Sequence, residues 1–397
     1  MKGRQLGPIL AASLALSGGL WPVSAFSQAN ATAAPTSKWY DTIALSGYVQ
    51  GSYVGNLHDP KSKTNTDRLF DNDSNSFNLN TFLLQVAKPV GETDNYGFTA
   101  RLRTGKDANV LRAGQYTANT GKPDATFSEI FLQEAYLTYV VPQLPKLALV
   151  GGKFVTPMGV EVVDTINNPN FPEGLLFNFA ENVTHTGLKG TYTFNDQINA
   201  MLGVANGWDN TSSGHTSKTV LWQLATNPTK QIAWSFQGMF GQELPDPSGS
   251  ERLSLDTILA YNPTDKWSFN LQGDWGQEHN VLGGGHGTTH WDGLGIWASY
   301  ATTKKLTESV RFEVLADQNG AGRFGTGLGI VPATGAPFSG PQTVKEATFT
   351  HKTMLRSNLG TRIEYRYDWS NQPYFENRGG FAARRQETIS ADAFVTF

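Results

Sequence analysis

The last ten residues of the chain alternate between apolar and polar side chains. Counting back in twos from Phe397 gives Val395, Ala393, Ala391 and Ile389, all of which are apolar. The intervening register, from Thr396 back to Thr388, is polar except for Phe394. A period of two places these registers on opposite faces of a β-strand. Such a strand fits the wall of a membrane barrel, and it also fits a half-buried strand of a soluble sheet.

The rest of the chain favours the barrel. No apolar run after the N-terminal region approaches the ~20 residues that a spanning helix needs. The chain nevertheless carries 23 Phe, 13 Tyr, 10 Trp and 42 Gly. Backbone groups in lipid must be hydrogen-bonded internally, so only helices and closed barrels cross a membrane. A soluble β-sandwich, propeller or β-helix is the alternative, and no internal repeat supports it.

The alternating pattern predicts an all-β fold, a transmembrane antiparallel β-barrel of about 16 strands. The predicted strands are 43–54, 77–88, 96–105, 129–141, 146–154, 184–194, 197–207, 219–227, 231–240, 252–262, 266–276, 290–301, 307–317, 344–354, 358–369 and 386–397.

The connections between these strands alternate in length. The short ones, such as Asn195-Asp196 and 263–265, are rich in Asn, Asp, Pro and Lys, as turns require. The long ones are 55–76, 106–128, 155–183, 208–218, 241–251, 277–289, 318–343 and 370–385. Outer-membrane barrels have short periplasmic turns and longer extracellular loops, so the alternation predicts that both termini are periplasmic.

The N-terminus predicts export. Lys2 and Arg4 precede an apolar stretch, and Val23-Ser24-Ala25 offers a small-x-small cleavage site. We expect a signal peptide at 1–25, with cleavage as late as 29 also compatible, a short periplasmic segment at 26–38 and the barrel at 39–397. The mature chain has 29 basic and 34 acidic residues, a net charge of −5 that argues against a nucleic-acid partner. There is no cysteine, which excludes disulfides and thiolate metal sites.

Charged residues in one register of the strands must face the lumen, because a charge facing the lipid midplane costs roughly 2–4 kcal/mol. A water-filled pore accommodates such charges at little cost, whereas a plugged barrel would need to neutralise them in ion pairs. The predicted pore-lining residues are Arg101, Arg103, Lys189, Arg311, Glu313, Asp317, Arg362, Glu364, Arg366 and Asp368.

The connection 155–183 differs from the other long ones. It contains many large apolar residues, which a surface loop gains nothing by exposing. It follows the fifth strand, where general porins of about 16 strands fold a loop inward. We therefore expect a constriction loop whose acids oppose the basic wall and select solutes by charge and size. Those acids are Glu161, Asp164, Glu173 and Glu181.

Three segments carry a family resemblance: Gly151–Glu161, Phe177–Lys189 and Arg362–Asp368. Together with the strand pattern over 39–397, they resemble the OmpL-like β-barrel porin family. The resemblance implies an outer-membrane barrel of a Gram-negative bacterium and names no substrate. It also implies that the barrel-assembly machinery reads the terminal Phe397, and a homo-oligomer, a trimer by analogy, is expected.

The sequence therefore predicts a porin, a water-filled channel for passive diffusion of small hydrophilic solutes, with outer-membrane lipid as its surroundings and no cofactor. A closed-lumen structural or adhesin-type barrel is the alternative, which the aromatic residues Tyr374, Phe375 and Phe381 would serve. A barrel enzyme is disfavoured, because catalysis needs a full set of nucleophile, base and orienting group, and His185, beside Thr184 and Thr186, is expected to be a lone histidine next to the constriction loop. His286 and His290 lie four apart in a glycine-rich loop, where that spacing does not pair metal ligands.

Overall fold

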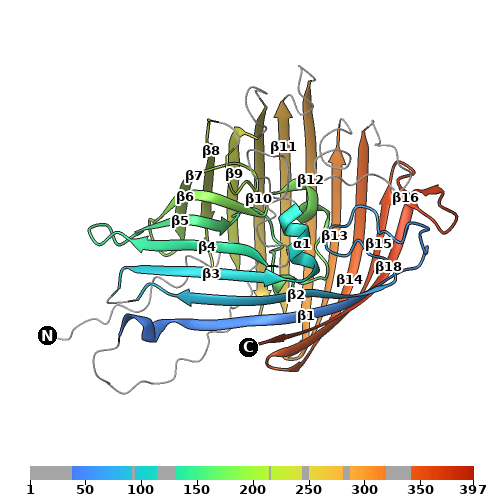
Figure 1. The fold of residues 1–397 in the computed structure, drawn as a ribbon, viewed down its shortest axis with the longest axis horizontal. Helices are drawn as coiled ribbons and strands as arrows, with labels where there is room; N and C mark the ends of the chain where they lie inside the picture. The colour runs from blue at the N-terminus through green and yellow to red at the C-terminus, as the bar shows by residue number, and fades with distance from the viewer. Residues whose placement is uncertain are drawn as a thin grey trace.

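The fold is a closed antiparallel β-barrel (Figure 1). The computed structural model describes residues 38–91, 94–113, 130–213, 216–243, 250–279, 287–318 and 341–397. The sixteen barrel strands are β1 (Ala44–Asn56), β2 (Ser76–Lys88), β3 (Tyr96–Thr104), β4 (Phe131–Val140), β5 (Leu147–Val155), β6 (Thr184–Thr193), β7 (Ile198–Ala205), β8 (Thr219–Thr226), β9 (Ile232–Gln242), β10 (Glu251–Thr264), β11 (Trp267–His279), β12 (Thr288–Thr303), β13 (Leu306–Asp317), β14 (Gln342–Arg356), β15 (Leu359–Ser370) and β18 (Arg385–Thr396).

All sixteen predicted strands are confirmed, and no strand end differs from its prediction by more than three residues. Two short strands, β16 (Phe375–Glu376) and β17 (Ala382–Ala383), form a separate hairpin in the last long connection. A helix, α1 (Lys106–Ala113), opens the connection between β3 and β4. The predicted signal peptide lies outside the described residues. No helix in the described part of the chain combines the length and the apolarity that crossing a membrane requires.

The barrel closes between its first and last strands. β1 pairs with β2 on one side and with β18 on the other. At the end of this seam, the backbone N–H of Gly47 donates to Phe397 O at 3.0 Å, and the N–H of Phe397 donates to Gly47 O at 3.0 Å. A Cβ at Gly47 would lie 2.7 Å from the Phe397 ring, so the terminal ring fits only because this position is glycine.

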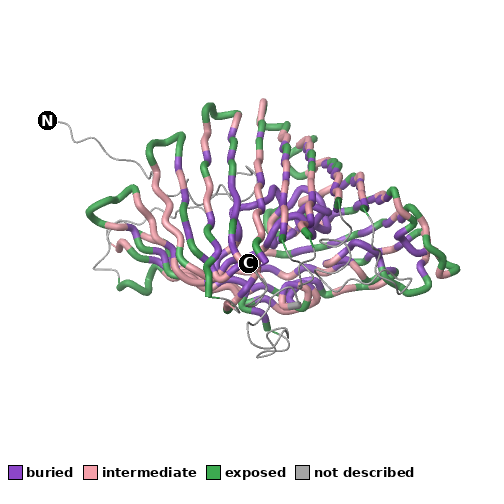
Figure 2. Tube along the Cα trace, turned by 90° about the horizontal axis from the view of Figure 1, so that it is seen from above, coloured by how far each residue is buried: buried purple, intermediate pink, exposed green. Residues whose placement is uncertain are grey.

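The two faces of the wall differ as the alternation predicts. On β15, Ile363 is 57% exposed and Tyr365 42% exposed, whereas Arg362, Glu364 and Arg366 are no more than 2% exposed. The alternation of buried and exposed positions runs along most strands (Figure 2). The apolar register therefore faces outward, towards the lipid expected there, and the charged register faces the interior.

The interior is lined by more than wall residues. Buried apolar residues of the connection 156–183, including Leu176 and Phe179, pack with Trp291 and Trp297 of β12. Phe177, from the same connection, packs with Phe70 of the β1–β2 connection and with Leu111 of α1. Phe375 of β16 joins the first of these clusters. Three other long connections thus pack with residues 156–183 in shared apolar clusters.

Candidate functional site

Residues 156–183, named the inner segment below, contact inward-facing side chains of strands on opposite sides of the barrel. Nearly all of them are buried, and they include a single helical turn at Leu176–Ala180. All four acids that the sequence singled out lie in this segment and are buried. Their surroundings differ from one acid to the next.

Asp164 binds two arginines of β3. Its Oδ1 accepts a hydrogen bond from Arg103 Nη2 at 2.6 Å, and its Oδ2 accepts one from Arg101. Burial raises the pKa of the Asp164 carboxyl, but Arg101 and Arg103 outweigh burial and hold that pKa below its ordinary value. The inner segment is therefore tied to β3 by charge-assisted bonds.

A β-bulge adds two more partners at this point. The pairing of β3 with β4 shifts between Arg101 and Leu102. Because of this shift, the consecutive residues Gln133 and Glu134 are both buried. Gln133 accepts from Arg103 Nε at 2.7 Å, and Glu134 accepts from Arg101 Nη1 at 2.9 Å. Strict alternation along β4 cannot predict this arrangement.

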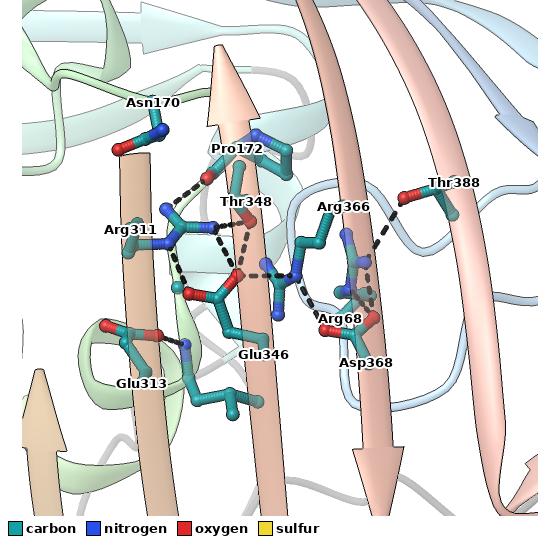
Figure 3. A network of polar contacts seen from close by, with 12 residues as sticks. Arg68, Asn170, Pro172, Arg311, Glu313, Glu346, Thr348, Arg366, Asp368 and Thr388 are labelled. Atoms are coloured by element: carbon teal, nitrogen blue, oxygen red, sulfur yellow. Dashed lines mark hydrogen bonds and ion pairs between the residues drawn. The ribbon is translucent and has the colours of Figure 1, made fainter. Parts of the chain in front are cut away.

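Glu161 binds the wall at β13. Its Oε1 accepts from Arg311 Nη1 at 2.6 Å, and Arg311 Nε also donates to Glu346 of β14 at 2.9 Å. Arg311 Nη1 further donates to Pro172 O at 2.9 Å, as Figure 3 shows. The Arg311 side chain is fully buried between wall and segment, so this ion pair is shielded from solvent.

The side chain of Arg362 binds backbone carbonyls of the inner segment. The guanidinium pairs with Asp392 of β18 at 2.9 Å through both Nε and Nη2. Its Nη1 donates to the carbonyl of Thr165 at 2.8 Å and makes longer contacts with those of Asn168 and Asn170. The wall thus donates to three backbone carbonyls of the segment, and the Thr165 carbonyl also accepts from the N–H of Asn168 at 3.0 Å.

Two wall carboxylates satisfy backbone N–H groups of the segment. Glu313 accepts from the N–H of Leu175, at the start of the helical turn, and Glu161 accepts from Gly174 N–H at 2.6 Å. Glu364 accepts from Phe171 N–H at 2.7 Å. A carboxylate at a helical N-terminus is favourable because unpaired N–H groups point towards it.

A chain of charges continues along the wall (Figure 3). Arg366 Nε donates to Asp368 Oδ1 at 2.7 Å, and Arg366 Nη1 donates to the Glu173 carbonyl at 3.1 Å. Asp368 Oδ2 accepts from Arg68 of the β1–β2 connection at 2.5 Å. Asp317 is buried at the C-terminal end of β13. Glu346 pairs with both Arg311 and Arg366, so charged residues of β13 and β15 form part of one network.

Among the described residues, no arginine pairs with the side-chain carboxyl of Glu173 or Glu181. Burial raises the pKa of the Glu173 carboxyl well above its ordinary value, and the charge of Asp107 raises it further. Burial also raises the pKa of Glu181, and the charge of Asp256 adds to that rise. Glu181 Oε1 accepts from Gln272 Nε2 at 3.1 Å. The expectation that these two carboxyls oppose a basic wall is therefore not matched by an ion pair in the described part of the chain.

The C-terminal end of the inner segment is held by the connection between β7 and β8. Asp209 Oδ1 accepts from the N–H groups of Val183 and Thr184 at 2.8 and 2.7 Å. Glu243, just beyond β9, accepts from Trp208 N–H at 2.7 Å. The Trp208 ring lies 6.2 Å from that of Trp291, whose Nε1 donates to Ala180 O at 3.1 Å. Burial raises the pKa of Asp209 to about 6 and that of Glu243 to about 7.

Lys189 and His185 lie on the inner face of β6. Lys189 Nζ sits 4.3 Å from the centre of the Phe154 ring. His185 is 1% exposed, and Asn182 contacts its ring nitrogens. No serine, cysteine or carboxylate hydrogen-bonds to His185 in the described part of the chain. Across the described ranges, no group of three or more His, Cys, Asp or Glu side chains is arranged to hold a metal ion.

The structure corrects the expected display of aromatic residues in the last long connection. Tyr374 is 4% exposed and Phe375 is buried, because they pack into the interior rather than project from the surface. Phe381 is 72% exposed. His286 lies outside the described residues, and His290 is on β12.

Sequence reasoning missed Arg68, Glu346 and Asp392 as partners in the network. Glu346 and Asp392 lie in the inward register of their strands, so the alternation along each strand could have identified them as inward-facing. Arg68 comes from an irregular connection, and its sequence context carries no periodic signal.

Residues 42–397 match the family described as "Putative beta-barrel porin-2, OmpL-like". The chain belongs to this family. The resemblance seen in the sequence is thereby confirmed. Membership of the OmpL-like family and the barrel fold together place the chain among outer-membrane β-barrels of the porin type.

Solved structures of outer-membrane proteins share the fold of this OmpL-like chain. The outer membrane channel DcaP of Acinetobacter baumannii is 9% identical, with a TM-score of 0.57 over 89% of this chain and 97% of that one. An anion-selective porin from Comamonas acidovorans is 8% identical, with a TM-score of 0.58 over 89% and 99%. The trimer form of OmpT, an outer membrane protein of Vibrio cholerae, is 9% identical, with a TM-score of 0.53 over 90% and 99%. A comparison with curated proteins finds no match.

Proposed function

We propose that this barrel is a porin through which small hydrophilic solutes diffuse passively. The observation that carries the proposal is the inner segment, which binds inward-facing groups on β3, β13 and β15. A segment bound to several parts of an inner wall reduces the free cross-section of a lumen. Its charged contacts also set the local potential, which is how pores select solutes.

In this proposal, Asp164 and Glu161 hold the segment in place, while Arg101, Arg103, Arg311 and Arg362 supply the basic wall. The short turns face the periplasm and the long connections face the outside, so both termini are periplasmic. We also propose that the barrel forms a homo-oligomer, and the trimeric form of a structural neighbour supports this proposal.

The competing function is a closed-lumen structural barrel. The pairing of Arg311, Arg362 and Arg366 with buried carboxylates favours it, because a neutralised network needs no water. Ion flow distinguishes the two functions directly.

The decisive experiment is single-channel recording in planar bilayers on the purified protein and on a variant in which 160–180 is replaced by a short glycine-serine link. The channel proposal expects measurable conductance in the first protein and a larger conductance with a wider size limit in the variant. Phe381→Ala, at an exposed position, is the control and should conduct like the parent. Absence of conductance in folded parent and folded variant alike would establish the closed barrel.

A further inference from the structure

Two basic residues flank a tryptophan on the outer face of the barrel. Lys345 of β14 is directly opposite Trp369 of β15, and Trp369 is directly opposite Arg385 of β18. The three side chains therefore lie in one row across three neighbouring strands. Directly opposed residues of antiparallel strands point to the same face of a sheet.

This row is on the lipid-facing side. Trp369 shares its register with Ile363 and Tyr365, which are 57% and 42% exposed. Around Trp369, the ring of Phe312 lies at 6.1 Å and that of Tyr367 at 5.2 Å. The row is at the end of the strands where the long connections begin, the end assigned above to the outside. Aromatic groups at such ends lie at the level of lipid headgroups.

The two cations have no anionic partner of their own. Neither Lys345 nor Arg385 has a carboxylate within 4 Å in the described part of the chain. Glu387, two residues from Arg385 on the same face, is already bound by Tyr365 Oη at 3.1 Å and by His58 at 3.6 Å. The row thus presents uncompensated positive charge beside an aromatic surface.

The pattern is not shared by every tryptophan at this rim. Trp275 of β11 also faces outward, and its direct neighbours are Leu255 and Asp292. A tryptophan that served only as an interfacial anchor would need no flanking cations. The cations beside Trp369 therefore favour an anionic binding partner at this position.

We propose that Lys345, Trp369 and Arg385 form a binding site for the phosphate-bearing headgroup of a lipid in the outer leaflet. Arginine binds phosphate with two parallel N–H donors, and lysine adds a compact charge. The tryptophan packs against the apolar part of the lipid while its N–H stays at headgroup level. The proposal depends on the orientation given above and not on whether the barrel conducts.

The test is native mass spectrometry of the detergent-solubilised barrel with bis-phosphorylated lipid A as the probe. The double variant Lys345→Gln/Arg385→Gln should bind it at least about tenfold more weakly, because two charge-assisted contacts are lost. Lys266→Gln is the matched control: Lys266 lies at the opposite rim, 6.0 Å from the Tyr300 ring, and its loss should not change binding. The exchanged pair Lys345→Arg/Arg385→Lys should retain most of the affinity.

Two further arms identify the headgroup as the ligand. Dephosphorylated lipid A should bind the parent no better than it binds the double variant, and inorganic phosphate at equal concentration should not displace the lipid. Equal retention of phosphorylated and dephosphorylated lipid would show that contact is only apolar, and it would overturn the proposal. Equal binding by parent and double variant, both shown to be folded by heat-modifiable migration in gels, would overturn it as well.

Discussion

Asp164 and Arg103 join the inner segment to the wall through a 2.6 Å bond between Oδ1 and Nη2. Arg103 is fully buried, and its next carboxylate neighbour, Asp107, is 3.6 Å away. Asp164 also binds Arg101, so a single carboxylate on the segment pairs with two wall arginines. Breaking a buried pair by removing one partner typically costs about 3–5 kcal/mol, because the remaining charge stays buried.

Asp164→Asn should therefore loosen the inner segment and leave excess positive charge at β3. We expect a larger and noisier single-channel conductance. In a KCl gradient, the reversal potential should shift in the direction that indicates greater selectivity for anions. Asp292→Asn, on the outer face, is the control and should leave the reversal potential unchanged. A variant with unchanged conductance and selectivity would show that Asp164 does not border the permeation path.

Replacing Arg101 and Arg103 together by glutamine should shift selectivity in the opposite direction, towards cations. The local potential becomes more negative, because Asp164 and Glu134 lose their partners. The shift should fade at 1 M salt, where the Debye length is about 3 Å. A reversal potential that indicates greater selectivity for anions would contradict the assignment of these residues to the pore.

The conductance should rise as the pH is raised from 5 to 8. Burial raises the pKa of Asp209 to about 6 and that of Glu243 to about 7, and both carboxyls hold the end of the inner segment. Such a group binds its proton more tightly in the folded protein than in the unfolded chain. Its stabilising effect is therefore full below the ordinary pKa near 4 and is lost as the pH rises through 6 to 7.

The pH effect can be assigned by substitution. Asp209→Asn and Glu243→Gln keep the acceptor oxygens for Val183, Thr184 and Trp208 but cannot ionise. Together they should flatten the pH dependence between 5 and 8. A full pH response in the double variant would assign it to other groups.

Deleting Phe397 should reduce the yield of assembled barrel. The deletion removes the two hydrogen bonds to Gly47 and the ring that stacks on Phe82 at 6.2 Å between centroids. The measurement is the fraction of outer-membrane protein that migrates as a compact, heat-modifiable band. Phe381→Ala serves as a control for loss of an aromatic residue, and a normal yield after deletion of Phe397 would refute the prediction.

The strands and their faces followed from sequence because both depend on a local pattern. A period of two, with charge excluded from one face, determines where residues such as Arg362 and Glu364 point. The same pattern does not state which acid binds which arginine. Asp392, Glu346 and Glu161 are far apart in the chain, and only the barrel's strand order brings each to its partner.

The interior packing was less predictable for a related reason. The apolar content of the inner segment indicated burial, and the structure shows its contacts with the wall. The burial of Arg68, Tyr374 and Phe375 had no such signal, because these residues come from connections in which no alternation marks an inward face. The bulge beside Gln133 also interrupts the alternation on which the prediction relied.

The pairing of Gly47 with Phe397 has a consequence for how the barrel is made. Until residue 397 is in place, β1 and β18 each keep part of an unpaired edge, and exposed edges invite pairing with other chains. A truncated chain would therefore be prone to aggregate and open to proteolysis before it could seal. The contact between Gly47 and Phe397 therefore covers the last backbone groups of this seam, and a barrel that lacks it keeps a short edge to which another chain can pair.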